Sequence, residues 1–363
     1  MTVHRGGGQA AEPLLIERAV QRVHASRGDL LARLLLAEEG DEAPAARLRE
    51  EGPLYRGRDG SVVVTGREPA RRILRDERFH RVPKAPDAAR QYTLPCVDAV
   101  IAAESGAGAP GPAAVHDEVD AAVEAALRAR DRAAELDLVG DVIRPVVAGV
   151  LCDTLRLPAR RRDDFRRLTG RTGVALDAAV CPPRPPEARG LPEALGRLRE
   201  LVGADGLALA VLGGELACVM AADAMLRALG RPAPAGAARP PGDAGDAAEP
   251  GVLFRDPPLR LQRLFAWEDV DLDGDRIEEN TRVLVLNTAP AGERGPEEAL
   301  ASAAAALPRS AVPATAIAVR TVAALRGHLD RLRPSGRIAR RLRAPVTRAV
   351  VRLPVAAAGR GVS

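Results

Sequence analysis

The sequence predicts a mainly α-helical protein with a small β region, an α+β fold class. Apolar residues recur at helical spacing in most of the chain, and one clear example is the run Leu30, Leu31, Leu34 and Leu35. A β-branched run, Val62–Val64, stands between two glycine turns and predicts a strand. Asp273-Gly274 predicts a hairpin turn in a small antiparallel sheet, with Val270/Leu272 before it and Val283/Val285 after it.

The elements can be placed in order along the chain. Residues 1–13, which include three consecutive glycines, are expected to be disordered, and a helical region begins at Leu14. After the strand at 61–65, Pro69 lies in the first turn of a helix that starts at Arg67. Further helices are expected over 115–135, 137–158 (kinked or started near Pro145), 160–180, 191–229 and 314–332. Residues 181–186 form a proline-rich rigid loop, and short strands near Pro345 and at Val350–Leu353 close the chain.

One segment interrupts this pattern. Residues 231–251 are dense in Pro, Gly, Ala and Asp and have few large apolar side chains, so they are expected to form a flexible linker. The linker lies inside a single domain that covers residues 14–363.

Composition excludes several functional classes. The chain has 363 residues, of which 46% are hydrophobic and 28% charged, as in soluble globular proteins. No apolar run approaches the roughly 20 residues that cross a bilayer, and the N-terminus lacks the apolar core of a secretory signal. Its four cysteines follow no disulfide-framework spacing. We therefore expect a cytoplasmic protein that has reduced cysteines and no membrane partner.

The basic residues do not indicate a nucleic-acid partner. The chain has 53 basic and 49 acidic residues, a net charge of +4, and Lys84 is its one lysine. An arginine run at 337–348 could bind phosphates or form a solvated face. No aromatic residues are interleaved with it for base stacking, which favours the solvated face.

The leucine stripe Leu30, Leu31, Leu34 and Leu35 allows two roles. An apolar helix face most often packs in the core, but a helix ahead of the main body could also dock a partner. The stripe is therefore the candidate partner interface, with core packing as the alternative.

A calcium-like motif is present but incomplete. Asp269, Asp271, Asp273 and Gly274 match the start of a calcium-binding loop. The twelfth position, which needs a bidentate glutamate, is Asn280, and the flanks are strand-like. We therefore expect no calcium site and no other metal site.

Several segments, in order and spacing, resemble bacterial cytochromes P-450 from Leu54 to Leu353. They are Tyr55-Arg56, Ser61 to Gly66, Ala70 to Phe79, Arg255 to Arg260, Val270 to Gly274, Ile277 to Leu286, Arg343 to Pro345 and Leu353 to Val355. The resemblance implies a fold that holds haem iron on a cysteine thiolate. None of the cysteines, which are Cys96, Cys152, Cys181 and Cys218, lies in the C-terminal third, where the family places that ligand.

The resemblance also implies that other haem positions have degenerated. The family's oxygen-handling threonines correspond to Leu216 and Ala217, after Gly213-Gly214-Glu215. The Glu of its Glu-x-x-Arg pair corresponds to Val252, with Arg255 retained. Of its two propionate-binding residues, the first corresponds to His116 and the second, an arginine, to Asp120, which would repel a propionate. These positions imply no haem, no other cofactor and no catalytic residue.

A closer resemblance is to haem-less cytochrome P-450-like proteins that activate deoxysugar glycosyltransferases in macrolide and anthracycline biosynthesis. It rests on Ala46 to Gly52, Leu136 to Asp141, Leu332 to Gly336, Arg340-Arg341 and Ala344 to Val346, which are similar to activators of the erythromycin-pathway type. This resemblance implies a non-catalytic partner that binds, stabilises and activates its cognate glycosyltransferase in a hetero-oligomer such as a heterotetramer. The sugar would be a TDP-amino sugar and the acceptor a polyketide.

Two alternatives remain open at this stage. One is a divergent haem monooxygenase with an unusual ligand, for which His328 is the histidine near the last helix. The other is a haem-less recruitment module that docks onto a carrier-protein assembly line.

Overall fold

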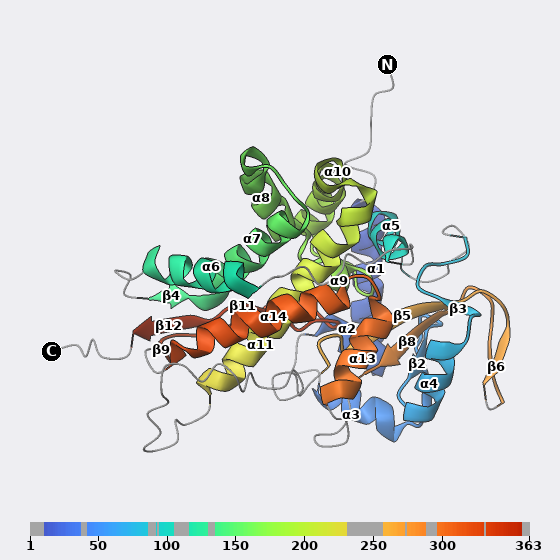
Figure 1. The fold of residues 1–363 in the computed structure, drawn as a ribbon. Coiled ribbons are helices and arrows are strands. Elements are labelled where there is room, and N and C mark those ends of the chain that lie inside the picture. Colours follow the sequence, from blue (N-terminus) through green and yellow to red (C-terminus); the bar gives the residue numbers. More distant parts are fainter. Residues whose placement is uncertain are drawn as a thin grey trace.

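Helices form most of the structure, and the longest sheet lies at one side of them (Figure 1). The structure is a computed structural model that describes residues 11–37, 42–85, 92, 94–104, 116–129, 135–230, 257–272, 274–287, 296–329 and 332–357. The α+β fold class with a small β region is confirmed. The linker expected at 231–251, Val252 and Arg255 lie outside the described residues.

The main sheet has five strands. Its strand order places Val62–Val64 inside the sheet, which explains why all three residues are apolar. The order is β1 (Leu54–Arg56), β2 (Val62–Val64), β8 (Arg282–Leu286), β5 (Leu261–Ala266) and β3 (Phe79–His80). Strands β2 and β8 are parallel, and the other pairs are antiparallel. Val62 and Val64 face a small core that includes Ile73 of helix α4 (Arg67–Arg75), whereas Val63 faces the main core. Because both faces of β2 are covered, all three residues are apolar.

The predicted hairpin exists, but one of its strands was wrong. Strand β6 (Val270–Leu272) pairs with β7 (Asp275–Ile277) across a turn at Gly274, whose φ of +92° favours glycine. Val283 and Val285 lie instead in β8 of the main sheet. The alternation at residues 283–285 is compatible with pairing either to β6 or to β2. In the structure these residues pair with β2, which is distant in the sequence.

The calcium-like motif lies at this hairpin; two of its carboxylates, Asp269 and Asp271, have protein partners, and Asp273 lies outside the described residues. Asp269 accepts hydrogen bonds from the Arg276 side chain and the Glu279 amide, and Asp271 accepts one from the Gly274 amide. In the part of the chain that the structure describes, no group of three or more His, Cys, Asp or Glu is arranged to hold a metal ion.

A long helical column runs through the centre of the molecule. It consists of α10 (Pro185–Ala208), a π-helical turn η4 (Leu209–Gly213) and α11 (Gly214–Leu229), as the prediction of one or two helices over 191–229 required. Gly203, at φ +77°, breaks the column within α10. Helix α11 packs along α14 (Ala311–Arg326), which begins earlier and ends earlier than the predicted 314–332. Figure 1 shows α14 lying along α11.

The remaining elements surround this column. Helix α1 (Ala11–Ser26) begins three residues before the expected start, and α7 (Arg144–Thr154) begins next to Pro145 as predicted. No strand forms near Pro345, where the chain turns instead. The others are α2 (Leu30–Leu36), α3 (Glu42–Glu50), α5 (Pro95–Ala103), α6 (His116–Ala129), β4 (Leu136–Asp137), π-helical η2 (Leu138–Ile143), η3 (Ala159–Arg161), α8 (Arg162–Thr172), α9 (Ala175–Ala178), α13 (Pro296–Ala306), β9 (Leu332–Pro334), β10 (Ala339–Arg340), β11 (Val350–Arg352) and β12 (Pro354–Ala357).

The column also contains the stretch that composition alone would match to a membrane. Contrary to the expectation from the sequence, residues 185–229 pass the length and composition criteria for crossing a bilayer, but 89% of the 18-residue window that passes is buried inside the protein. The apolar character of this stretch is explained by its central position in the core.

Candidate functional site

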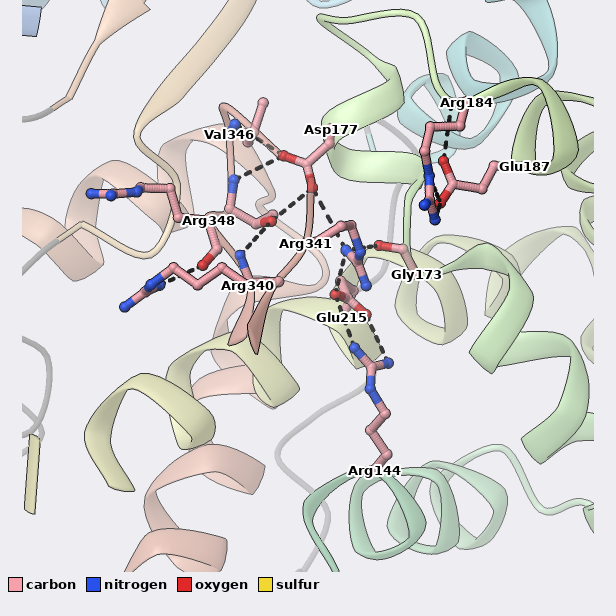
Figure 2. A network of polar contacts seen from close by, with 12 residues as sticks. Arg144, Gly173, Asp177, Arg184, Glu187, Glu215, Arg340, Arg341, Val346 and Arg348 are labelled. Carbon is pink, nitrogen blue, oxygen red and sulfur yellow. Dashed lines mark hydrogen bonds and ion pairs between the residues drawn. The ribbon is translucent and has the colours of Figure 1, made fainter. Parts of the chain in front are cut away.

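Glu215 is the centre of a buried ionic network on the central column. Its side chain is 2% exposed and accepts hydrogen bonds from Nη1 and Nη2 of Arg144 at 3.1 and 3.3 Å. Nη1 of Arg341 lies 2.8 Å from the same carboxylate, on the side opposite Arg144 (Figure 2). Two guanidiniums from α7 and from the C-terminal segment therefore hold one carboxylate of α11.

Arg341 extends the network to Asp177 on α9. The guanidinium donates to the carbonyl oxygen of Gly173 at 2.7 Å and lies 3.6 Å from Asp177 Oδ2. Asp177 also accepts hydrogen bonds from the amides of Val346 and Thr347 and from the Thr347 hydroxyl, at 2.9, 3.0 and 2.7 Å. The network thus connects α7, α9, α11 and the C-terminal segment, as Figure 2 shows.

The two carboxylates differ in pKa. Burial raises the pKa of Glu215, but the charges and hydrogen bonds of Arg144 and Arg341 outweigh burial and leave that pKa below its usual value. Burial also raises the pKa of Asp177, and there the opposing effects of Arg341 and Thr347 leave it at about 6. Glu215 is therefore ionised at neutral pH, and its oxygens are committed to arginines.

This arrangement suits a structural role better than acid–base chemistry. A general acid or base needs a reacting group within hydrogen-bond reach, whereas both oxygens of Glu215 contact guanidiniums. A cavity of about 200 Å³ lies beside Arg144, Cys218 and Glu215. Sites for drug-sized ligands usually have about 300–1,000 Å³. Burial raises the pKa of Cys218 to about 12, so its thiol is not an anionic ligand at neutral pH.

If haem lay between the central column and the segment before α14, as the resemblance to cytochromes P-450 implies, it would meet close packing at Gly213 and Ser310. A Cβ on Gly213 would lie 3.3 Å from Cβ of Ser310, so the two segments are in van der Waals contact. Glu104, 1% exposed, fixes residues 309–310 by accepting hydrogen bonds from the Arg309 and Ser310 amides and the Ser310 hydroxyl. A cavity of only about 60 Å³ adjoins Leu307. The residues present do not fit a porphyrin.

The degenerate haem positions lie in different environments. Leu216 and Ala217 are fully buried core residues of α11. Asp120 lies on α6 and pairs with Arg320 of α14 at 3.0 Å. His116 begins α6, but its side chain lies outside the described part. His328, the alternative haem ligand, lies just beyond α14 with Nε2 3.0 Å from Glu124, so it too already has a protein partner.

The leucine stripe is a core element, and the prediction that it forms an interface needs correction. Its four side chains are 1–4% exposed, and they belong to the main core. Helix α2 is covered by α1 and α3, and a Cβ on Gly57 would lie 2.8 Å from Leu31 Cδ2. The apolar spacing showed one buried face, and only the tertiary packing showed that other parts of the same chain bury it.

The ionic network left little signal in the sequence. Arg144 carried one usable signal, because it is a lone charge inside an apolar stretch. Residues 142–143 precede it, and residues 145–152 follow it. Asp177 carried the same signal, as a lone charge between the apolar runs 174–176 and 178–181, whereas Arg341 carried none because arginines flank it. The ion-pair partners of Arg341 are 126 and 164 positions away along the chain, and only the fold brings them together.

Solved structures similar to this chain include cytochromes P-450. One is P450BioI in complex with an acyl carrier protein that carries hexadec-9Z-enoic acid, at a TM-score of 0.64 and 17% identity over 88% of this chain and 98% of that one. Another is CalO2, also at a TM-score of 0.64 and 17% identity, over 89% and 97% of the two chains. The fold is therefore that of a cytochrome P-450.

Relatives with similar sequences define a more specific family within the cytochrome P-450 fold. No family model matches the sequence. Protein TylM3 of Streptomyces fradiae is 30% identical over 96% of this chain and 93% of its own, and Protein AknT of Streptomyces galilaeus is 29% identical over 94% of each. Protein DesVIII of Streptomyces venezuelae is 29% identical over 94% and 92%. The chain belongs to this family of cytochrome P-450-like auxiliary proteins.

Proposed function

We propose that this chain is a non-catalytic partner that activates and stabilises a glycosyltransferase in antibiotic biosynthesis. The enzyme would transfer a nucleotide-activated deoxysugar, a TDP-amino sugar, to a polyketide. The observation that carries the proposal is the close packing of the central column at Gly213 against Ser310, in a chain that belongs to a family of auxiliary proteins. A fold without room for its cofactor can still offer a surface to a partner.

The physical mechanism is linkage between binding and the active state of the enzyme. A partner that binds only the active conformation stabilises it by RT ln(1 + [L]/Kd), about 2.7 kcal/mol when its free concentration is a hundred times Kd. That free energy raises the ratio of active to inactive enzyme about a hundredfold. No residue of this chain has to contact the sugar. The complex would be a hetero-oligomer, such as a heterotetramer, in the cytoplasm.

Sugar transfer by the cognate glycosyltransferase, with and without this chain, tests the proposal. We expect the two proteins to co-elute and the chain to raise the transfer rate severalfold. A Leu34→Glu variant is the control for a specific effect, because a charge at this buried position should prevent folding. Equal rates with wild type, variant and no added chain would refute the activator role.

An absorption spectrum of the purified chain after addition of haemin separates the monooxygenase alternative. The contact at Gly213 and Ser310 predicts no Soret band shift from that of free haemin. A stoichiometric, shifted Soret band together with no effect on sugar transfer would favour a haem enzyme. Co-purification with a carrier protein, in place of the glycosyltransferase, would favour the recruitment module.

A further inference from the structure

Helix α1 exposes an apolar face. Among the described residues, the exposed large hydrophobic side chains are Leu15, Ile16, Val20, Val23, Val312, Ile338 and Leu342, and the first four lie on this one helix. They are 37–60% exposed, and at 100° per residue they and the exposed Ala19 fall within one 140° sector. Solvent-facing sectors of surface helices are normally polar, and a contiguous apolar sector usually marks a contact with another molecule.

The opposite face of α1 packs against the rest of the protein and holds the helix in place. Leu14, Gln21 and Ala25 are buried, and the helix packs on α2 and α10. Arg18 also donates to the carbonyl oxygen of Pro183 at 3.0 Å. The outer sector is therefore additional to what folding requires. Figure 1 shows α1 beside α2 and α10.

The chain's own N-terminal segment is a poor cover for this sector. Residues 1–10 have the sequence MTVHRGGGQA, in which Met1 and Val3 are the large apolar residues and three glycines follow. Ordering these glycines would cost backbone entropy without adding apolar contact. A separate molecule is the better occupant.

The charge at the edge of the apolar sector indicates which kind of separate molecule would bind there. Two charged side chains are exposed among residues 13–28, which the structure describes. They are Arg22 and Arg27, and both are cationic. Arg27 lies four residues after Val23, on the same side of the helix. Two copies that met face to face would bring like charges together, whereas a groove with a carboxylate rim would complement them.

We propose that the outer face of α1 (Leu15, Ile16, Ala19, Val20 and Val23) docks into an apolar, acid-rimmed groove of the glycosyltransferase that this chain activates. The proposal rests on the function proposed above and identifies its contact surface. Recognition is of the helix-in-groove type, in which apolar anchors on one helix face supply contact area and the cationic edge sets orientation.

The test is a titration of sugar-transfer stimulation with the full chain and with the double variant Ile16→Glu/Val23→Glu. We expect the concentration that gives half-maximal stimulation to rise about tenfold or more, because two exposed anchors become charges inside an apolar contact. The maximal stimulation should remain, since the bound state is the same. The matched control is Val312→Glu, an apolar residue 54% exposed on α14, which should titrate as wild type does.

A second variant tests the charged edge separately. Arg27→Glu should raise the half-maximal concentration and nearly abolish the salt dependence of binding, because Arg22 alone then balances the new carboxylate, whereas Arg27→Ala should have a smaller effect. Thermal unfolding of each variant should match wild type because the substituted side chains are exposed.

The outcomes separate failure of the surface from failure of the function. If wild type stimulates transfer and the Ile16→Glu/Val23→Glu variant titrates identically, the surface assignment is wrong and the activator function stands. If wild type gives no stimulation, both fail. Two further results would overturn the assignment: a wild-type dimer in sedimentation that this variant abolishes, or binding of wild type but not the variant to anionic phosphatidylserine vesicles.

Discussion

Replacing Glu215 by glutamine removes the negative charge at the centre of the ionic network and leaves its volume almost unchanged. Arg144 and Arg341, whose side chains are 25% and 11% exposed, would then face each other across a neutral amide. Breaking a buried ion pair by removing one partner costs about 3–5 kcal/mol, because the remaining charge stays desolvated. We expect a loss of this size, since the amide cannot neutralise either guanidinium.

The corresponding shift in melting temperature follows from the size of the chain. An unfolding entropy of about 2.1 cal/mol/K per residue amounts to about 0.8 kcal/mol/K for 363 residues. A loss of about 3–5 kcal/mol therefore lowers Tm by about 4–7 °C. Differential scanning calorimetry at pH 7 measures this shift directly.

The control is the surface pair Arg166–Asp163, in which Asp163 is 97% exposed. Asp163→Asn should change stability by less than about 1 kcal/mol, because solvent screens an exposed pair. If Glu215→Gln shifts Tm no more than Asp163→Asn, the network does not hold the four segments together and the structural role assigned to Glu215 is refuted.

Three further predictions use the same unfolding measurements. Burial raises the folded-state pKa of Asp177 to about 6, from about 3.9 in an unfolded chain. The stability that Asp177 contributes is therefore fully present below about pH 4, and the free energy of unfolding falls by about 3 kcal/mol as pH rises through 6. Asp177→Asn should flatten this part of the urea-derived stability profile, and an unchanged slope would contradict the assignment. Leu34→Ala should cost about 2–5 kcal/mol and Leu15→Ala less than about 0.5, so equal effects would place Leu34 outside the core. Gly173→Ala should destabilise, since its Cβ would lie 2.6 Å from Glu215 Oε2, whereas Gly149→Ala, with nothing within 4 Å, should stabilise helix α7 by about 0.4–1 kcal/mol; the same sign for both would refute the close approach.

Local pattern predicted the elements whose packing follows from their own side chains. The valine run became β2, the kink or helix start expected near Pro145 proved to be the start of α7, and the long apolar stretch became the central column. Each of these depends on neighbours within one or two turns along the chain. Element boundaries were less accurate, since the last helix covers 311–326 in place of 314–332.

Pairings between distant segments could not be predicted in the same way. The alternation at Val283 and Val285 is satisfied by any strand neighbour, and the parallel register with β2 is set by segments more than 200 residues apart. Glu215 could be identified as an acid that the family resemblance retains, but its two arginine partners lie 71 residues before it and 126 residues after it in the sequence. A charge finds its partner through three-dimensional distance, which spacing along the chain does not encode.

The sequence by itself determined the fold class, the family and the absence of a cysteine ligand in the C-terminal third, because each follows from residue types and their order. Only the tertiary structure decided which apolar helix face is buried and which is exposed. The stripe at Leu31 and Leu34 and the outer face at Ile16 and Val23 have similar helical spacing, yet the first packs under α1 and α3 and the second faces solvent. Periodicity shows that a face is apolar, and only the packing of the rest of the chain shows whether that face is already covered.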